Sequence, residues 1–213
     1  MRCSASVNAE LGETAVVLAS NCYTDSMPLL QRIIFRKQPI CTTTQSFPLA
    51  FALLIAGYCG EHFEFTDTKI GNDYAEAIRL VLGTNINIST VNAYHRFLST
   101  RELDIFSSKS EVGLANGSRQ NVLSDVPLSK VNWSGDFVNP RLQSSRGHHV
   151  GMYFTNAEYF ADSTTVSIAL ALIHGLDRTR IIYVPAPTST ASDWHLKIAE
   201  ALQIVSISLE YVD

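Results

Sequence analysis

The clearest hydrophobic pattern in the chain lies between residues 163 and 195. Almost every residue from Val166 to Ile173 is apolar, which predicts a buried helix without a polar face. Gly175 is placed to end that helix, because glycine readily adopts the left-handed conformation of a helix C-terminus. The apolar run Ile181–Val184 is typical of a central strand that is covered on both faces. Helix and strand in this order predict a layered α/β domain.

The segment after this strand is polar and leads into another helix. Pro185 and Pro187 prevent the strand from continuing. Thr190, with Asp193 three residues later, has the pattern of a capping box, so we expect the last helix to begin here. From Ile204 to Val212 apolar residues alternate with polar ones, which predicts a final strand at or near a sheet edge.

The rest of the chain shows a similar succession of strand and helix patterns. Strands are expected at Ala15–Ala19, His62–Thr66, Ile86–Ile88, Leu103–Phe106 and Val150–Phe154, and helices at Met27–Phe35, Phe47–Cys59 and Asp73–Leu82, with Gly83 ending the last helix and Asn156 capping the apolar one. No segment repeats another in sequence. We therefore expect one α/β domain over residues 1–213, with a mainly parallel, Rossmann-like sheet and helices on both of its faces.

One long segment does not fit this succession. From Asn116 to Gly147 the chain is rich in Asn, Ser, Gly and Pro and has no clear period. Irregular chain of this length is uncommon inside a compact domain. It indicates either a functional loop or a sub-boundary of the domain within residues 112–147.

Composition and charge exclude several classes of protein. Apolar residues make up 46% of the chain and charged residues 17%, which suits a buried core and not a disordered protein. The net charge is −4 and there is no basic stripe, so a general nucleic-acid-binding role has little electrostatic support. The N-terminus lacks the apolar core of a secretory signal, and Phe47–Cys59 is about half as long as a membrane span. We expect a cytoplasmic protein whose cysteines, Cys3, Cys22, Cys41 and Cys59, are free thiols.

Two polar loops are candidates for ligand binding. The first contains Ser107, Ser108, Lys109, Ser110 and Glu111, and its N–H groups and lysine ammonium suit a phosphate. The second contains Thr188, Ser189, Thr190 and His195, where hydroxyl groups and a histidine that titrates near neutral pH follow a strand. Ligands of open α/β sheets bind beyond the carboxyl ends of the strands, so we expect both loops to share one cleft. The alternatives are a solvated turn for the first loop and an ordinary capped helix with a surface histidine for the second.

A family resemblance involves both regions. The segment IFSSKSEVGLA resembles the pyrophosphate loop of PP-loop ATPases, and ALALIHGL together with IIYVPAPT is similar to the later part of 7-cyano-7-deazaguanine synthase-like members of that family. The resemblance implies ATP as a cofactor that adenylates a substrate, with its pyrophosphate held on the loop. Ser108 and Lys109 stand where the family has glycines, and Glu111 stands for its aspartate, so the loop is degenerate.

Three further patterns have weaker support. His148 and His149 are adjacent, and adjacent residues of a strand point to opposite sides, so we expect no metal site there. Asp67 and Lys69 are similar to two residues of a PD-(D/E)xK nuclease, which needs a further acidic residue to hold magnesium. Cys22 follows a strand and would be a nucleophile if a histidine approached it, and otherwise a packed thiol.

The leading hypothesis is binding of a nucleotide or nucleotide-like small molecule at the carboxyl ends of the strands. It leaves open whether the chain is an ATP-dependent enzyme with a degenerate PP-loop. The first alternative is a non-catalytic protein-interaction module that binds a protein partner, and the second is a PD-(D/E)xK-like nuclease. Neither the sequence nor its charge indicates a membrane partner.

Overall fold

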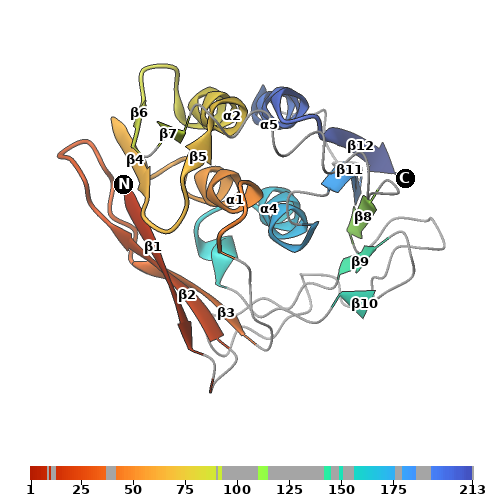
Figure 1. Cartoon of the computed structure of the whole chain (residues 1–213), viewed down its shortest axis with the longest axis horizontal. Helices are drawn as coiled ribbons and strands as arrows, with labels where there is room; N and C mark the ends of the chain where they lie inside the picture. The colour runs from red at the N-terminus through yellow and green to blue at the C-terminus, as the bar shows by residue number, and fades with distance from the viewer. Residues whose placement is uncertain are drawn as a thin grey trace.

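A computed structural model describes residues 1–8, 10, 13–36, 42–89, 91–92, 110–114, 142–144, 149–150, 156–175, 179–185 and 193–212. Two five-stranded sheets form the outer layers of the molecule. The α-helices of the described residues lie between the sheets, as the centre of Figure 1 shows. The fold is therefore α/β, with each sheet covered by helices on its inner side.

The first sheet has the strand order β3-β2-β1-β4-β6. Its strands are β1 (Arg2–Asn8), β2 (Glu13–Ala19), β3 (Arg32–Arg36), β4 (His62–Phe65) and β6 (Asn87–Ile88). The first three strands are antiparallel neighbours, whereas β4 runs parallel to β1 and β6 runs parallel to β4. Helices α1 (Ser46–Leu54) and α2 (Asn72–Leu82) provide the two parallel crossovers. A small pair of strands, β5 (Ile70–Gly71) and β7 (Val91–Asn92), lies beside this sheet.

The second sheet has the order β10-β9-β8-β11-β12. Its strands are β8 (Ser110–Leu114), β9 (Leu142–Ser144), β10 (His149–Val150), β11 (Thr179–Pro185) and β12 (Ser208–Val212). As in the first sheet, the first three strands of this half, β8, β9 and β10, are antiparallel neighbours. The strand β11 runs parallel to β8, and β12 runs parallel to β11. The crossovers are α4 (Ser163–Gly175), which follows the short 3-10 helix η3 (Ala157–Tyr159), and α5 (Asp193–Ile204).

The two halves of the chain therefore have the same topology. Each half contains three antiparallel strands, a helix, a parallel strand, a second helix and a final parallel strand. Equivalent helices meet between the sheets, because α1 contacts α4 and α2 contacts α5. The chain is thus a structural repeat although its sequence shows none. The first half ends by residue 92 and the second begins by residue 110. A sub-boundary is expected within residues 112–147, and most of those residues lie outside the described part of the chain.

Two expectations about the sheet are corrected by this topology. Each sheet combines antiparallel and parallel neighbours equally and is mixed, not mainly parallel. The helices of the described residues lie on one face of each sheet, whereas helices are expected on both (Figure 1). The general preference for right-handed crossovers accounts for this placement. The chain moves from β1 to β4 to β6 in one direction, so two crossovers of the same hand put α1 and α2 on the same side.

The core explains why α1 and α4 are apolar on all sides. Every residue of α1 is buried, because the helix packs between the first sheet and α4. Phe47 and Phe51 of α1 contact each other and the strand residues Phe35 and Phe65, with ring centroids 5.0 to 6.0 Å apart. Aromatic contacts of this kind add to the free energy gained from burial of the rings.

Most elements near the expected positions are confirmed. They are β2, α1, β4, α2 with Gly83 at its end, β6, α4, β11 and α5, together with β12 at a sheet edge. The strand β11 lies between β8 and β12, and its residue Ile182 is fully buried. The expected strand Val150–Phe154 is described only at its first residue, and Leu103–Phe106 lies outside the described residues.

The helix expected at Met27–Phe35 is wrong, and the hydrophobic pattern of the sequence does not predict the strand β1. The segment instead leads into β3, where the side chains of Ile33 and Phe35 are fully buried in the core. The spacing of its apolar residues fits a helix and a strand equally well in so short a run. Pairing with β2 decides in favour of the strand.

Candidate functional site

The first predicted loop is only partly described. Ser107, Ser108 and Lys109 lie outside the described residues, whereas Ser110 begins β8. Ser110 pairs with Thr179 at the amino end of β11. The segment that contains Thr188, Ser189 and Thr190 follows the carboxyl end of β11 and also lies outside the described residues.

The prediction that the two loops share one cleft is therefore wrong for Ser110 and Glu111. Since β8 and β11 are parallel, the amino end of β8 and the carboxyl end of β11 lie at opposite edges of the sheet. The strand expected before this loop, Leu103–Phe106, lies outside the described residues, and β8 begins at Ser110 within the expected loop.

At the carboxyl edge of β11 the structure brings together the first turns of two helices. Thr165 of α4 accepts a hydrogen bond from Trp194 Nε1 of α5, with 3.0 Å between Nε1 and Oγ1. His195, the next residue of α5, has its Nε2 3.8 Å from Asp162 Oδ1. The His195 side chain is 13% exposed, and the Asp162 side chain is 51% exposed. A half-exposed carboxylate, a histidine and an indole therefore form one cluster.

Asp162 is the residue that the sequence argument missed. It caps α4, because its Oδ1 accepts the Thr165 backbone N–H at 3.0 Å and its Oδ2 accepts the Thr165 hydroxyl at 2.6 Å. Burial acts to raise the pKa of Asp162, but the hydrogen bonds from Thr165 and the nearby His195 outweigh it and lower the pKa below its ordinary value. The available signal was an Asp three residues before Thr165 and one helical turn before the apolar run that begins at Val166.

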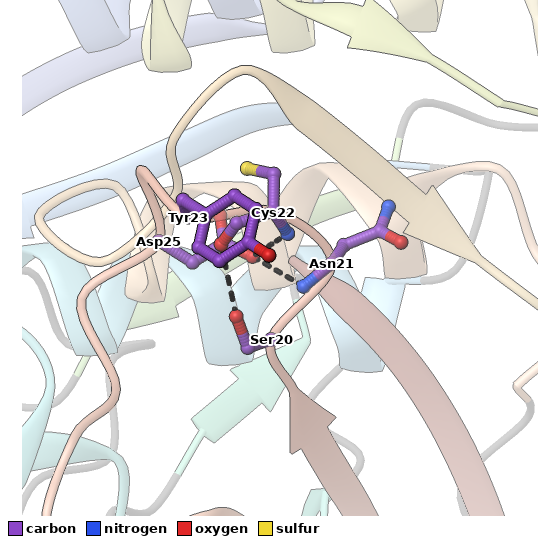
Figure 2. A pocket seen from close by; sticks show the side chains of 5 residues that line it. All are labelled: Ser20, Asn21, Cys22, Tyr23 and Asp25. Carbon is purple, nitrogen blue, oxygen red and sulfur yellow. Dashed lines mark hydrogen bonds between the residues drawn. The ribbon is translucent and has the colours of Figure 1, made fainter.

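A second candidate site lies in the connection between β2 and β3. Ser20, Asn21, Cys22, Tyr23 and Asp25 line an open pocket there. Figure 2 shows Tyr23 and Cys22 extending from this loop, with hydrogen bonds gathered at Asp25 and at the hydroxyl of Ser20. Ser20 Oγ donates to the carbonyl of Cys22 at 3.0 Å, which tightens the turn.

Asp25 holds this loop in place through both oxygens of its carboxylate. Its Oδ2 accepts the backbone N–H of Asn21 at 2.6 Å and that of Cys22 at 3.3 Å. Its Oδ1 accepts the N–H of Gly60 at 2.8 Å, and the Met1 ammonium lies 2.9 Å from Oδ2. Burial acts to raise the pKa of Asp25, but these hydrogen bonds and the ammonium lower it to about 2.

The Cys22 thiol is accessible and not packed, contrary to the more conservative expectation. Its sulfur lies 3.0 Å from Thr24 Oγ1, which also accepts the N–H of Glu61 at 3.1 Å. The hydrogen bond with Thr24, together with one from the Glu61 backbone, lowers the pKa of Cys22. Burial raises the pKa of Cys59 to about 11, and Cys3 is fully buried in the core. These three cysteines are free thiols, as expected, and Cys41 lies outside the described residues.

The remaining sequence candidates have structural roles where they are described. Asp67 Oδ2 accepts the N–H of Ala5 at 2.7 Å and the Thr66 hydroxyl at 3.1 Å, so it fastens β1 to the end of β4. The carbonyl of Lys69 accepts a hydrogen bond from Gln45 at 2.7 Å. His149 belongs to β10, and His148 lies outside the described residues. Within the described ranges no group of three or more His, Cys, Asp or Glu side chains could hold a metal ion.

Known proteins supply no family for this chain. No family model matches it, and no curated protein or solved structure matches it either. In the part of the chain that the structure describes, no helix is long and apolar enough to cross a membrane. What the protein binds is inferred from the two sites themselves.

Proposed function

We propose that the protein binds a nucleotide-like small molecule at the carboxyl edge of β11, with its nucleoside part beside Trp194 and Asp162. The observation that supports this is the Trp194–Thr165 hydrogen bond, which joins the first turns of α5 and α4. The helix α5 follows β11 and α4 precedes it, so both helices begin at the carboxyl end of that strand. This is the edge at which open α/β sheets bind their ligands.

The charges of the cluster favour the nucleoside over the phosphates. Asp162 is half exposed and its pKa is lowered, so it is ionised at neutral pH. Asp193 adds an exposed carboxylate in the first turn of α5. Two carboxylates repel a phosphate at these helix ends but accept hydrogen bonds from the hydroxyl groups of a ribose. A base that stacks on the Trp194 indole would add about 1–3 kcal/mol.

Thr188, Ser189 and Thr190 remain proposed partners for the polar part of the ligand, since they connect β11 to α5. ATP is one ligand to be tested, as the PP-loop resemblance implies. The adenylation chemistry of that family is not included in the proposal, because Ser110 begins a strand at the opposite edge of the sheet.

Thermal unfolding with adenosine and with ATP tests the proposal. A ligand that binds only the folded state stabilises it by mass action and so raises the melting temperature. At a ligand concentration one hundred times its Kd, the free energy of unfolding rises by about 2.7 kcal/mol. We expect adenosine to stabilise the protein, and Asp162→Asn to reduce that effect at least several-fold. Asparagine is an equally good helix cap, so this change removes charge while it preserves α4.

Asp73→Asn is the matched control, because Asp73 also lies in the first turn of a helix, α2, on the other half of the fold. We expect it to leave the adenosine shift unchanged. A parent protein that neither adenosine nor ATP stabilises would contradict the proposal. Equal shifts in Asp162→Asn and the parent would remove Asp162 from the site.

A second candidate function, a protein-interaction module, is favoured by the loop between β2 and β3. The side chains of Tyr23 and Leu29 are fully exposed there, and Met27 is 41% exposed. Tyr159, 47% exposed, belongs to a neighbouring segment. Tyr58 joins the two, because its carbonyl accepts the N–H of Ser26 at 3.0 Å and its hydroxyl donates to the Tyr159 carbonyl at 3.4 Å.

Apolar side chains on a fixed loop are typical of a binding surface, because little conformational entropy is lost when a partner binds. Site-specific photo-crosslinking in cells tests this candidate. We expect a partner to be captured from position 29 but not from the exposed position Asn87, and to be lost in the variant Tyr23→Ser. Equal capture from positions 29 and 87 would contradict it.

A further inference from the structure

Two cysteines lie on segments that contact each other at the edge of the first sheet. Cys22 belongs to the connection between β2 and β3, and Cys59 belongs to the connection between α1 and β4. The segments are joined by the hydrogen bond from Glu61 N to Thr24 Oγ1, at 3.1 Å. A Cβ atom on Gly60 would lie 2.1 Å from Thr24 Oγ1 and 2.6 Å from the Thr24 carbonyl carbon. The two backbones therefore approach so closely that only glycine fits between them.

Asp25 spans the gap between the two cysteine backbones. One carboxylate accepts the N–H of Cys22 at 3.3 Å and the N–H of Gly60, the residue after Cys59, at 2.8 Å. The two thiols also interact electrostatically, since negative charge on Cys22 contributes to raising the pKa of Cys59. Cys22 and Cys59, the residue before Gly60, therefore lie on neighbouring stretches of backbone, and a disulfide between them requires Cα atoms about 5.5 Å apart.

The two thiols have different environments. Cys22 Sγ lies at an open pocket beside the Thr24 hydroxyl, 3.0 Å away, which stabilises a thiolate. Cys59 is partly buried, and its sulfur lies 3.4 Å from the carbonyl oxygen of His62, an acceptor that favours the protonated thiol. Cys22 is therefore suited to attack an external disulfide, and Cys59 is suited to attack the mixed disulfide that results.

We propose that Cys22 and Cys59 are a thiol–disulfide exchange site for a low-molecular-weight disulfide such as glutathione disulfide. The Cys22 thiolate attacks one sulfur of the external disulfide, forms a mixed disulfide and releases one thiolate. Cys59, on losing its proton, attacks the Cys22 sulfur of that mixed disulfide, forms the Cys22–Cys59 bond and releases the second small thiol. The protein loses two electrons and two protons, and the external disulfide is reduced to two thiols.

This inference is independent of the ligand site at β11, because it concerns the first half of the fold. The folded full-length protein is incubated with glutathione disulfide, quenched with acid and analysed by intact mass and peptide mapping. We expect a loss of two hydrogen atoms and a peptide that links Cys22 with Cys59. Cys59→Ser should stop at one glutathione on Cys22, whereas Cys22→Ser should leave Cys59 unreacted.

Alkylation by iodoacetamide at neutral pH gives a second measurement that needs no variant. We expect Cys22 to react about tenfold or more faster than Cys59, because its thiolate is more accessible and better stabilised. Circular dichroism of both serine variants checks that they fold. A parent protein that stops at the mixed disulfide, a link from Cys22 to Cys3 or Cys41, or equal alkylation of Cys22 and Cys59 would each overturn the proposal.

Discussion

Asn156 forms two hydrogen bonds with the backbone around Ile34, and so takes the place of a neighbouring strand beside β3. Its Oδ1 accepts the N–H of Ile34 at 3.0 Å, and its Nδ2 donates to the carbonyl of Arg32 at 2.9 Å. The strand β3 is at the edge of the first sheet, and Asn156 directly precedes η3 and α4 of the second half. A side chain from one half therefore satisfies the open edge of the other.

The variant Asn156→Ala should be destabilised by about 2–3 kcal/mol, because it leaves a buried N–H and a carbonyl without their partner. Asn156 is only 2% exposed, so water replaces the amide poorly. Urea unfolding measures the change. The control is Asn87→Ala, at an exposed position of β6, where we expect less than about 0.5 kcal/mol. Equal losses in the two variants would mean that the Asn156 contacts contribute nothing to stability.

The sequence alone could not predict this role of Asn156. Its position before the apolar helix suggested a cap, and the structure gives that role to Asp162. The hydrogen-bond partners of Asn156 are more than 120 residues away in the chain, and local pattern carries no information on such contacts. By contrast, α2 and α4 could be predicted closely, because their apolar spacing and their terminal glycines act within a few residues.

In the candidate sites, too, roles that depend on local sequence could be predicted, whereas roles that depend on distant contacts could not. His195 could be identified because it follows a strand and a capping pattern, both of which are local. The roles of Asp25 and Cys22 depend on Gly60 and Glu61, which lie beside them only in the folded chain, where β1 pairs with β4. The face on which the helices lie depends on the direction in which successive crossovers move through the sheet, and that direction is a property of the whole topology.

Gly60 and Gly57 give a direct test of the packing between the two loops. Gly60→Ala should be clearly destabilised, because its Cβ would lie within 3 Å of Thr24 backbone and side-chain atoms. Gly57→Ala is the matched control, since nothing lies within 4 Å of its added Cβ. We expect a loss of about 2 kcal/mol or more for the first and less than about 0.5 kcal/mol for the second, measured by urea unfolding. Similar midpoints for both variants would show that the loops move apart easily.

The stability of the protein should depend on the ionisation of Asp25 in acid. Its pKa is about 2 in the folded state, below the ordinary value of 3.8, so the folded protein favours the ionised carboxylate. A depressed pKa contributes stability that is complete above about pH 4 and is lost as the pH falls toward about 2. Asp25→Asn should therefore be less stable than the parent at pH 5, with a difference that shrinks as the pH falls.

Asp162 also has a lowered pKa, so the parent protein loses stability in acid for more than one reason. The comparison of parent and Asp25→Asn at each pH isolates the part that belongs to Asp25. Urea unfolding at several pH values gives both curves. A difference between them that stays constant from pH 5 to pH 2 would exclude a contribution from Asp25 ionisation.

Thr14 offers a change that should stabilise the protein. It is fully buried in β2, and its hydroxyl has no hydrogen-bond partner among the described residues. A buried hydroxyl without a partner has lost its hydrogen bonds to water, and valine fills nearly the same space without that cost. Valine also suits a strand, so the pairing of β2 with β1 and β3 should be preserved.

We expect Thr14→Val to raise the free energy of unfolding by about 1 kcal/mol, and the melting temperature by about 2–4 °C for a chain of this size. Thr14→Ser is the informative control, because it keeps the hydroxyl and removes a buried methyl group. It should lower stability by about 1 kcal/mol through the cavity that remains. Calorimetry of the three proteins decides the matter. A lower melting temperature for Thr14→Val than for the parent would show that the hydroxyl has a stabilising partner in the folded protein.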